Sequence, residues 1–238
     1  MNMEDYICET NNSKNIQSLF NLFEKYMSDI GFDRVILGLM TDHPRLKKEA
    51  EHGFLKNYPA DWVERYFDQK YVHIDPVRHK AYDAIGAYTW DELKASMQLS
   101  NKQIQMFNEA EDARLFNGVG VSMRGPGGAI AAVGAACSVK NGNLNKDILD
   151  AANLMSVQFY TCYWRLMEKK VTLVHLTAKE QEILTWSAAG YTKSQIAHKL
   201  CISVHTVDFH VRNCLAKLEA QNITHAVSRA LNLSLIHM

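Results

Sequence analysis

The chain has 238 residues, of which 26 are Lys or Arg and 26 are Asp or Glu, so its formal net charge is zero. This balance excludes an overall attraction to polyanions. There is no apolar run of the roughly 18 residues that span a bilayer and no cleavable apolar start, so we expect a cytoplasmic protein without membrane contact. The five cysteines are scattered, which fits neither a disulfide framework nor a zinc site, and we expect no metal or cofactor.

The amino-terminal part of the chain, residues 14–167, alternates helical and strand patterns and is long enough for one domain with a sizeable core. Apolar residues at helical spacing predict a first helix, with a stripe formed by Ile16, Leu19, Phe20, Phe23 and Met27. The patterns then predict a strand at 34–40, helices at 59–67 and over most of 93–115, strands at 119–124 and 129–139, and a closing helix at 144–167.

The segment Gly125-Pro126-Gly127-Gly128 separates the last two strands and has the composition of a hairpin turn. Consecutive strands joined by a tight turn favour an antiparallel sheet, and helices on either side would give a three-layer α-β-α sandwich. No helix start follows these glycines to offer its amides to a phosphate, which excludes a nucleotide-binding loop.

Residues 57–76 combine aromatic and acidic side chains. Trp62 and Tyr66 are four residues apart and share a helix face, while Pro76 holds Asp75 extended. These rings and one carboxylate can therefore converge on a small polar group. On residue types alone the rings are better explained as core aromatics, and Asp75 as a turn cap is equally open.

The tail from Leu176 to Leu218 contains three helical segments separated by two short turns. Gly190 ends the first segment, and Ser203 begins the third after a short turn. This is the spacing of a helix-turn-helix, which presents its second helix to a DNA groove. Capping boxes start the first two segments: Thr177 with Glu180, and Thr192 with Gln195.

The third helix of the tail has an apolar stripe and a polar face. The stripe consists of Val204, Val207, Val211, Cys214, Leu215 and Leu218. The opposite face carries Thr206, Phe209 and Asn213, flanked by His205, His210, Arg212 and Lys217. The polar types can bond base edges or phosphates, and Phe209 can touch a thymine methyl. An ordinary amphipathic helix with a solvated face is the alternative.

From Thr177 onward the chain carries six basic and four acidic residues, a net charge of +2, and the preceding part therefore carries −2. One weakly basic tail would bind DNA poorly, and dimerisation would double the contacts. The last segment, residues 224–235, has apolar residues at helical spacing that can close the tail core or supply a symmetric contact. The connector, residues 168–175, either transmits a change between the parts or acts as a rigid spacer.

The tail motif LTAKEQEILTW...G.T...IA..L.IS..TV.FHV.N...KL resembles the LuxR-type family of bacterial quorum-sensing regulators. The resemblance extends over residues 14–235, because the family pattern also matches the 57–76 segment, Trp90 and Gly118. It implies an autoinducer-binding domain at 1–167, a linker at 168–175 and a four-helix helix-turn-helix domain at 176–238, with 203–217 as the recognition helix. The implied DNA contacts are Lys193, His205, Thr206, Phe209, His210, Arg212, Asn213 and Lys217.

Two departures from the family pattern remove positive charge that would face phosphate. Tyr191 stands where Lys usually follows the glycine, and Asp208 stands where a Lys is frequent. Each lost phosphate contact weakens DNA binding and flattens its salt dependence by about one unit of slope.

The resemblance also implies roles in an acyl-homoserine-lactone pocket. Trp62 would donate to the lactone carbonyl, and Asp75 would accept from the ligand's amide N–H. Tyr66 and Trp90 would pack against the lactone ring. Tyr58 would donate to the acyl carbonyl. Gly118 would let the backbone approach where a side chain would intrude.

Three further positions depart from the family pattern, because Val77, Gly120 and Gly134 stand where Thr or Ser is common. Such hydroxyls help to hold an acyl carbonyl or a 3-substituent, so their absence bears on the choice of acyl chain. Small residues also dominate the strand at 129–136, and residues two apart line one face of a strand. The pocket is therefore expected to have room for a longer chain.

These features predict an α+β protein that acts as a ligand-dependent transcriptional regulator. It would bind an N-acyl-homoserine lactone and, as a homodimer, a two-fold symmetric DNA element, with RNA polymerase as a possible partner. We do not expect an enzyme such as a lactone hydrolase, because no His/Asp/Glu cluster has metal spacing and no Ser stands in a nucleophile elbow. The main alternative is a regulator with the same tail that answers a different small molecule or none.

Overall fold

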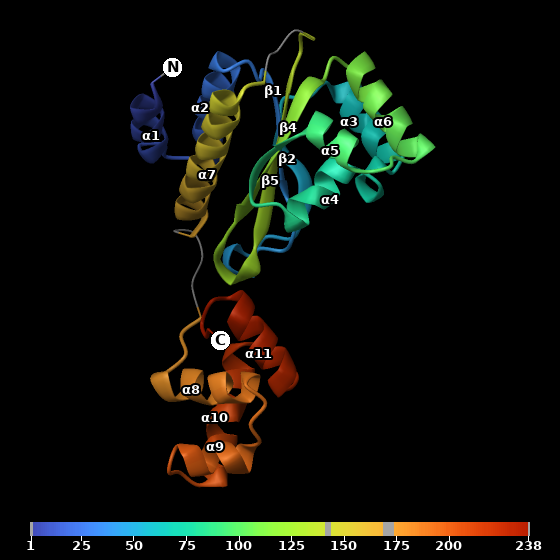
Figure 1. Ribbon diagram of the computed structural model, residues 1–238. Helices are drawn as coiled ribbons and strands as arrows, with labels where there is room; N and C mark the ends of the chain where they lie inside the picture. The colour runs from blue at the N-terminus through green and yellow to red at the C-terminus, as the bar shows by residue number, and fades with distance from the viewer. Residues whose placement is uncertain (1, 141–143, 169–173, 238) are drawn as a thin grey trace. The chain divides into compact units, whose positions relative to one another are not determined.

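A five-stranded antiparallel sheet forms the centre of the amino-terminal part of the computed structural model (Figure 1). The strands are β1 (Arg34–Leu39), β2 (Glu51–Lys56), β3 (Gly86–Thr89), β4 (Phe116–Arg124) and β5 (Ile130–Cys137). They stand in the order β2-β1-β5-β4-β3, and every neighbouring pair is antiparallel. In the middle of the sheet β1 lies beside β5, with Arg34 opposite Ala136.

Helices cover both faces of this sheet (Figure 1). On one face lie α1 (Met3–Asn11), α2 (Ile16–Asp29) and α7 (Lys146–Glu168), and on the other lie α3 (Ala60–Asp68), α4 (Pro76–Asp83), α5 (Trp90–Ser96) and α6 (Asn101–Asp112). Short 3-10 turns are formed by Pro44–Leu46, Tyr71–His73 and Pro126–Gly128, and the last of them closes the β4-β5 hairpin. The predicted α-β-α layering and hairpin are confirmed.

Four elements of the sheet domain were not expected from the sequence: α1, β2, α4 and β3. Strand β2 contains Gly53 with φ +65°, and β3 has only four residues, so neither shows a clean two-residue alternation. The expected helix within 93–115 is divided into α5 and α6, because Ser100 starts a new helix in a capping box with Gln103.

Local capping places two side chains that matter below. Asp75 is the N-cap of α4, and Pro76 takes the first helical position, where its missing N–H has no cost. Thr89 ends β3 and caps α5 in a capping box with Glu92, which makes Trp90 the first residue of α5. The acid Asp75 and the indole of Trp90 therefore lie at the starts of two helices, α4 and α5.

Four helices form the carboxy-terminal module, as predicted: α8 (Ala178–Ala188), α9 (Lys193–Lys199), α10 (Val204–Lys217) and α11 (Ile223–Asn232). Both predicted capping boxes are present, with Thr177 before α8 and Thr192 before α9. Gly190, with φ +85°, ends α8, and Cys201 takes a left-handed conformation in the turn before Ser203 caps α10. This is a helix-turn-helix made by α9 and α10.

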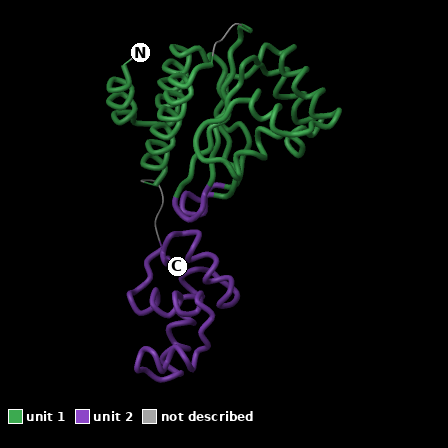
Figure 2. Tube along the Cα trace, viewed as in Figure 1, with its two compact units in different colours: residues 1–42, 49–125, 130–169 green, residues 43–48, 126–129, 170–238 purple. Residues whose placement is uncertain are grey.

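The structure describes residues 2–140, 144–168 and 174–237. The chain divides into two compact units, one made of residues 1–42, 49–125 and 130–169, the other of residues 43–48, 126–129 and 170–238 (Figure 2). Most of the predicted connector, 168–175, lies outside the described residues. The division into 1–167, 168–175 and 176–238 stays a prediction. Within the described residues, no helix is both long enough and apolar enough to cross a bilayer.

Candidate ligand cavity and DNA-binding face

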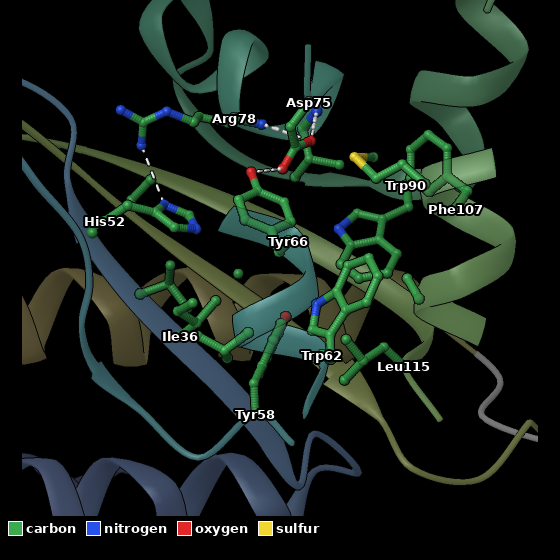
Figure 3. A pocket seen from close by; sticks show the side chains of 18 of the residues that line it. Ile36, His52, Tyr58, Trp62, Tyr66, Asp75, Arg78, Trp90, Phe107 and Leu115 are labelled. Atoms are coloured by element: carbon green, nitrogen blue, oxygen red, sulfur yellow. Dashed lines mark hydrogen bonds between the residues drawn. The ribbon is translucent and has the colours of Figure 1, made fainter. Parts of the chain in front are cut away.

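A cavity of about 90 Å³ lies between the sheet and helices α3 to α6 (Figure 3). The sheet side of its wall is built from small and aliphatic residues: Ile36, Gly38, Ala132, Val133 and Gly134. The helical side is largely aromatic. Seven of the eight ligand contacts predicted from the sequence line this cavity, namely Tyr58, Trp62, Tyr66, Asp75, Val77, Trp90 and Gly134. Their roles toward a ligand stay a prediction.

Asp75 is the acid of the cavity, and its carboxylate is held from two sides. The Tyr66 hydroxyl donates to Oδ2 at 2.7 Å. The backbone N–H groups of Val77 and Arg78 donate to Oδ1 at 2.8 and 3.3 Å. Burial raises the pKa of Asp75, and these three hydrogen bonds act against that rise. The carboxylate has about four acceptor positions, so one remains for a further donor.

Within the described part of the chain, two polar atoms of the cavity wall are buried without a hydrogen-bond partner. They are the Tyr58 hydroxyl and the Trp90 indole nitrogen. Burial also raises the pKa of Tyr58, so its hydroxyl remains protonated. A buried donor without an acceptor costs free energy comparable to a lost hydrogen bond. The cavity therefore presents two donors beside one acid, an arrangement that a ligand with both acceptors and a donor would complete.

The structure corrects the expectation for Gly118, which does not line the cavity. A Cβ on Gly118 would come within 2.0 Å of the Trp90 ring. Because Gly118 has no side chain, the Trp90 indole can pack directly against β4. The group that lies close to Gly118 is therefore Trp90 and not a ligand. Gly120 is similar, since a Cβ there would meet Tyr88 at 2.4 Å. Of Gly118, Gly120 and Gly134, the last lines the cavity.

Helix α10 presents the polar face that the sequence predicted, with one difference. His205 and Arg212 are exposed, and Phe209 is 51% exposed although it is a large apolar residue. Val204, placed on the apolar stripe from the sequence, is also exposed, because it is the first residue of the helix and precedes the packed turns. An exposed aromatic on a helix-turn-helix is a suitable contact for a thymine methyl.

Family models match both halves of the chain. Residues 15–163 match an autoinducer binding domain, and residues 174–230 match the bacterial regulatory proteins of the luxR family. This chain belongs to the LuxR family of quorum-sensing transcriptional regulators. The resemblance seen in the sequence is confirmed in both parts of the chain.

Similar LuxR-type proteins cover nearly the same length. The transcriptional activator protein ExpR of Dickeya dadantii is 30% identical over 80% of this chain and 81% of its own. The quorum-sensing regulator RhlR of Pseudomonas aeruginosa is 28% identical over 92% of this chain and 90% of its own. Escherichia coli SdiA shares the fold, with a TM-score of 0.78 at 23% identity over 99% and 98% of the two chains. It has also been solved in complex with octanoyl-rac-glycerol.

Two of the lysines predicted to contact DNA are held by acids of this LuxR-type chain itself. The Lys217 ammonium lies 2.7 Å from Oε2 of Glu180, which is 2% exposed. Burial opposes ionisation of Glu180, but the bonds from Lys217 and Thr177 outweigh it and lower its pKa. Lys217 therefore joins α10 to α8, and its contact with DNA stays a prediction.

Lys193 is held in a second ion pair, by the acid that departs from the family pattern. Its ammonium lies 2.5 Å from Oδ1 of Asp208, and both side chains are about half exposed. The hydrogen bond from Lys193 is the main cause that lowers the pKa of Asp208. Asp208 therefore neutralises Lys193, one of the residues predicted to contact DNA.

Tyr191, the other departure, has a packing role. Its ring and that of Trp186 meet edge to face at 5.1 Å, and the Lys199 ammonium lies 4.6 and 4.5 Å from the two ring centroids. A cation held over two aromatic rings is fixed in position without being neutralised by an acid. The sequence analysis did not identify this contact of Lys199. Lys199 ends α9 and Tyr191 lies just before this helix, and that spacing could have suggested the contact.

Sequence reasoning also missed two polar residues of the cavity wall, His52 on β2 and Arg78 on α4. Arg78 Nη1 lies 3.2 Å from His52 Nδ1, and the His52 ring stacks on Tyr66 with 5.2 Å between centroids. Burial, and then the charges of Arg78 and Lys56, lower the pKa of His52 to about 4. The imidazole is therefore neutral at pH 7 and accepts the hydrogen bond from Arg78.

Proposed function

We propose that this chain is a receptor for an N-acyl-homoserine lactone and that the bound lactone controls binding to double-stranded DNA. The observation that carries the proposal is that one acid and two donors without a partner among the described residues line the same cavity. Asp75 has room for one more donor, which an amide N–H would supply. The Tyr58 hydroxyl lacks an acceptor, which an acyl carbonyl would supply.

The remaining aromatic residues fit the same ligand. Trp62 lines the cavity and is 7% exposed, so its indole N–H is available to a lactone carbonyl inside. Trp90 forms another part of the wall, next to Phe107 (Figure 3). Tyr66 supports the acid through its hydroxyl and can still cover the lactone with its ring. A ligand that completes these bonds becomes part of the domain core and stabilises the fold.

The DNA-bound form is proposed to be a homodimer on a two-fold symmetric element. A single module with few free cations binds DNA weakly, and two-fold pairing doubles its contacts. Leu154 and Val157 on α7 support pairing, since they are 56% and 46% exposed and lie one turn apart. The protein would act in the cytoplasm and contact RNA polymerase at the promoter. No catalytic step is proposed, and the lactone would leave the cavity intact.

The test is mass spectrometry of the small molecules that co-purify with the full chain from cells supplied with a mixture of acyl-homoserine lactones. We expect one intact lactone in about equimolar amount with the wild-type protein. The variant Asp75→Asn should retain none, and Asp61→Asn, an exposed acid on α3, should retain it as the wild type does. Recovery of an acylglycerol, or of no ligand, would favour a LuxR-type regulator with a different signal. Recovery of the ring-opened acid would indicate hydrolysis.

A further inference from the structure

Arg78 and His52 form a polar pair at one end of the cavity wall. Figure 3 shows them on the side opposite to Trp90, Phe107 and Leu115. They come from opposite walls, since His52 belongs to strand β2 and Arg78 to helix α4. We propose that this pair is a second recognition point, which binds an oxygen acceptor on the acyl chain of the ligand. This inference rests on the proposed function and narrows the class of lactone.

The first step is the set of partners that Arg78 has. Its guanidinium carries five N–H donors. Among the described residues its side chain makes two polar contacts, both through Nη1: His52 Nδ1 at 3.2 Å and Met40 Sδ at 3.5 Å. Neither partner carries negative charge, and no described carboxylate forms an ion pair with it. A partly buried cation with only neutral partners keeps a desolvation cost that an oxygen acceptor in the cavity would reduce.

The second step is the donor that His52 offers. Because Nδ1 accepts from Arg78, the neutral ring carries its hydrogen on Nε2. Nε2 makes no hydrogen bond to any residue in the described part of the chain. The pair thus offers guanidinium N–H groups and one imidazole N–H, and it offers no acceptor.

The third step is the position of this pair relative to the acid. His52 stacks on the Tyr66 ring at an angle of 16°, and the hydroxyl of the same Tyr66 donates to Asp75. The backbone N–H of Arg78 also donates to Asp75. The donor pair therefore lies about one aromatic ring away from the acceptor that would hold the amide. A ligand that reaches both needs an N–H near its head and an oxygen a few atoms along its chain.

This geometry favours an oxygenated acyl chain over a plain alkyl chain. Guanidinium N–H groups recognise carbonyl and carboxylate oxygens, and they gain nothing from methylene groups. A plain alkyl chain would instead cover Arg78 and leave its donors without water or partner. The shared chemistry is an oxygen acceptor. Its two possible sources, a neutral oxo group and a terminal carboxylate, are separated by the experiment below.

The experiment measures lactone affinity of the full-length protein by calorimetry, with three octanoyl-homoserine lactones. One is unsubstituted, one carries a 3-oxo group and one carries a carboxylate at the chain end. We expect one of the oxygenated lactones to bind about tenfold more tightly than the unsubstituted one, as for one charge-assisted hydrogen bond. In Arg78→Met this preference should disappear, while the affinity for the unsubstituted lactone stays the same or rises.

Two further variants separate recognition from folding. Lys80→Met removes a charge from the exposed face of the same helix and should keep the preference. His52→Phe keeps a ring to stack on Tyr66 but removes the donor, and should lose part of the preference. Arg78→Met retains the backbone N–H to Asp75, so its unfolding temperature without ligand should not fall. A lower unfolding temperature with an unchanged preference would assign Arg78 a structural role and overturn the inference.

The outcomes also distinguish this inference from the proposed function. If all three lactones bind with equal affinity to wild type and to Arg78→Met, the recognition point is disproved and the lactone receptor stands. If the unsubstituted lactone binds best to the wild type, the inference is likewise overturned. If none of the lactones binds, both the proposed function and this inference fail together.

Discussion

The helix-turn-helix module and the ligand cavity hold their acids in different ways. In the module the buried Glu180 accepts from the Lys217 ammonium and from the backbone of Thr177. In the cavity Asp75 accepts from the Tyr66 hydroxyl and from two backbone N–H groups, and no described cation forms an ion pair with it. The acid of the module therefore has a charged partner, whereas the acid of the cavity has neutral donors and keeps one acceptor position.

Removing the ion pair of Glu180 in the helix-turn-helix module should have the largest effect on stability. Lys217→Met leaves the carboxylate of Glu180 buried without its cation, and we expect a loss of about 1–3 kcal/mol in the free energy of unfolding of the module. Hydrogen exchange of the backbone amides in α8 and α10 of the full chain, at several denaturant concentrations, measures it. Lys179→Met removes an exposed pair with Glu182 and should cost no more than about 0.5 kcal/mol. Equal losses in the two variants would contradict the scaffold role of Lys217.

Replacing the acid of the cavity should have the reverse effect: ligand binding is lost and stability without ligand is kept. Asp75→Asn retains an oxygen to cap α4 and removes a buried charge, so the unfolding temperature without ligand should stay the same or rise at neutral pH. Stabilisation by lactone, about 2.7 kcal/mol at a hundredfold excess over Kd, should be absent. Thermal unfolding with and without lactone measures both. A normal lactone response in this variant would remove Asp75 from the site.

The comparison can be sharpened on the DNA-binding face, where Asp208 neutralises Lys193. Asp208→Asn frees this ammonium for a phosphate, so affinity for a mixed-sequence duplex should rise about threefold to tenfold at 0.1 M salt. The slope of log K against log salt should steepen by about one unit. Fluorescence anisotropy at several salt concentrations measures both. Glu219→Gln removes an acid that is 83% exposed, and it should change the slope much less. Identical slopes in the two variants would place Lys193 away from DNA.

The smallest expected effect concerns pH. His52 has a folded pKa lowered to about 4 from 6.5, so the unfolded state takes up a proton first as the pH falls. The contribution of His52 to stability is therefore present above about pH 6.5 and is lost as the pH falls toward 4. Asp75 acts in the opposite sense, because its folded pKa is raised. The difference in unfolding free energy between wild type and His52→Gln should shrink across this range.

The sequence predicted features that are encoded by neighbouring residues. The capping boxes at Thr177 and Thr192, the glycine turn after β4 and the long α7 helix depend on residues a few positions apart, and all are present. Strand β3 was missed because it has four residues, and α4 because its only signal was the Asp75-Pro76 start. Local periodicity carries too little information in such short elements.

Contacts between distant residues explain the remaining differences. The ion pair of Lys217 was not predicted because nothing in its own helix shows that Glu180, 37 residues earlier, lies beside it. Arg78 and His52 meet across 26 residues, from a helix and a strand that were both unexpected. Gly118 was correctly singled out as a position without room for a side chain. The group that fills this room, the Trp90 ring, became visible only in the fold.

The position of β1 beside β5 sets the order of events during synthesis. Val35 pairs with Ala135, a hundred positions later, so the centre of the sheet closes only after β5 has left the ribosome. Trp62, Tyr66 and Asp75 are synthesised before β5. Until β5 is made, the sheet side of the cavity wall is incomplete. The cavity wall is therefore completed late, once β5 has joined β1.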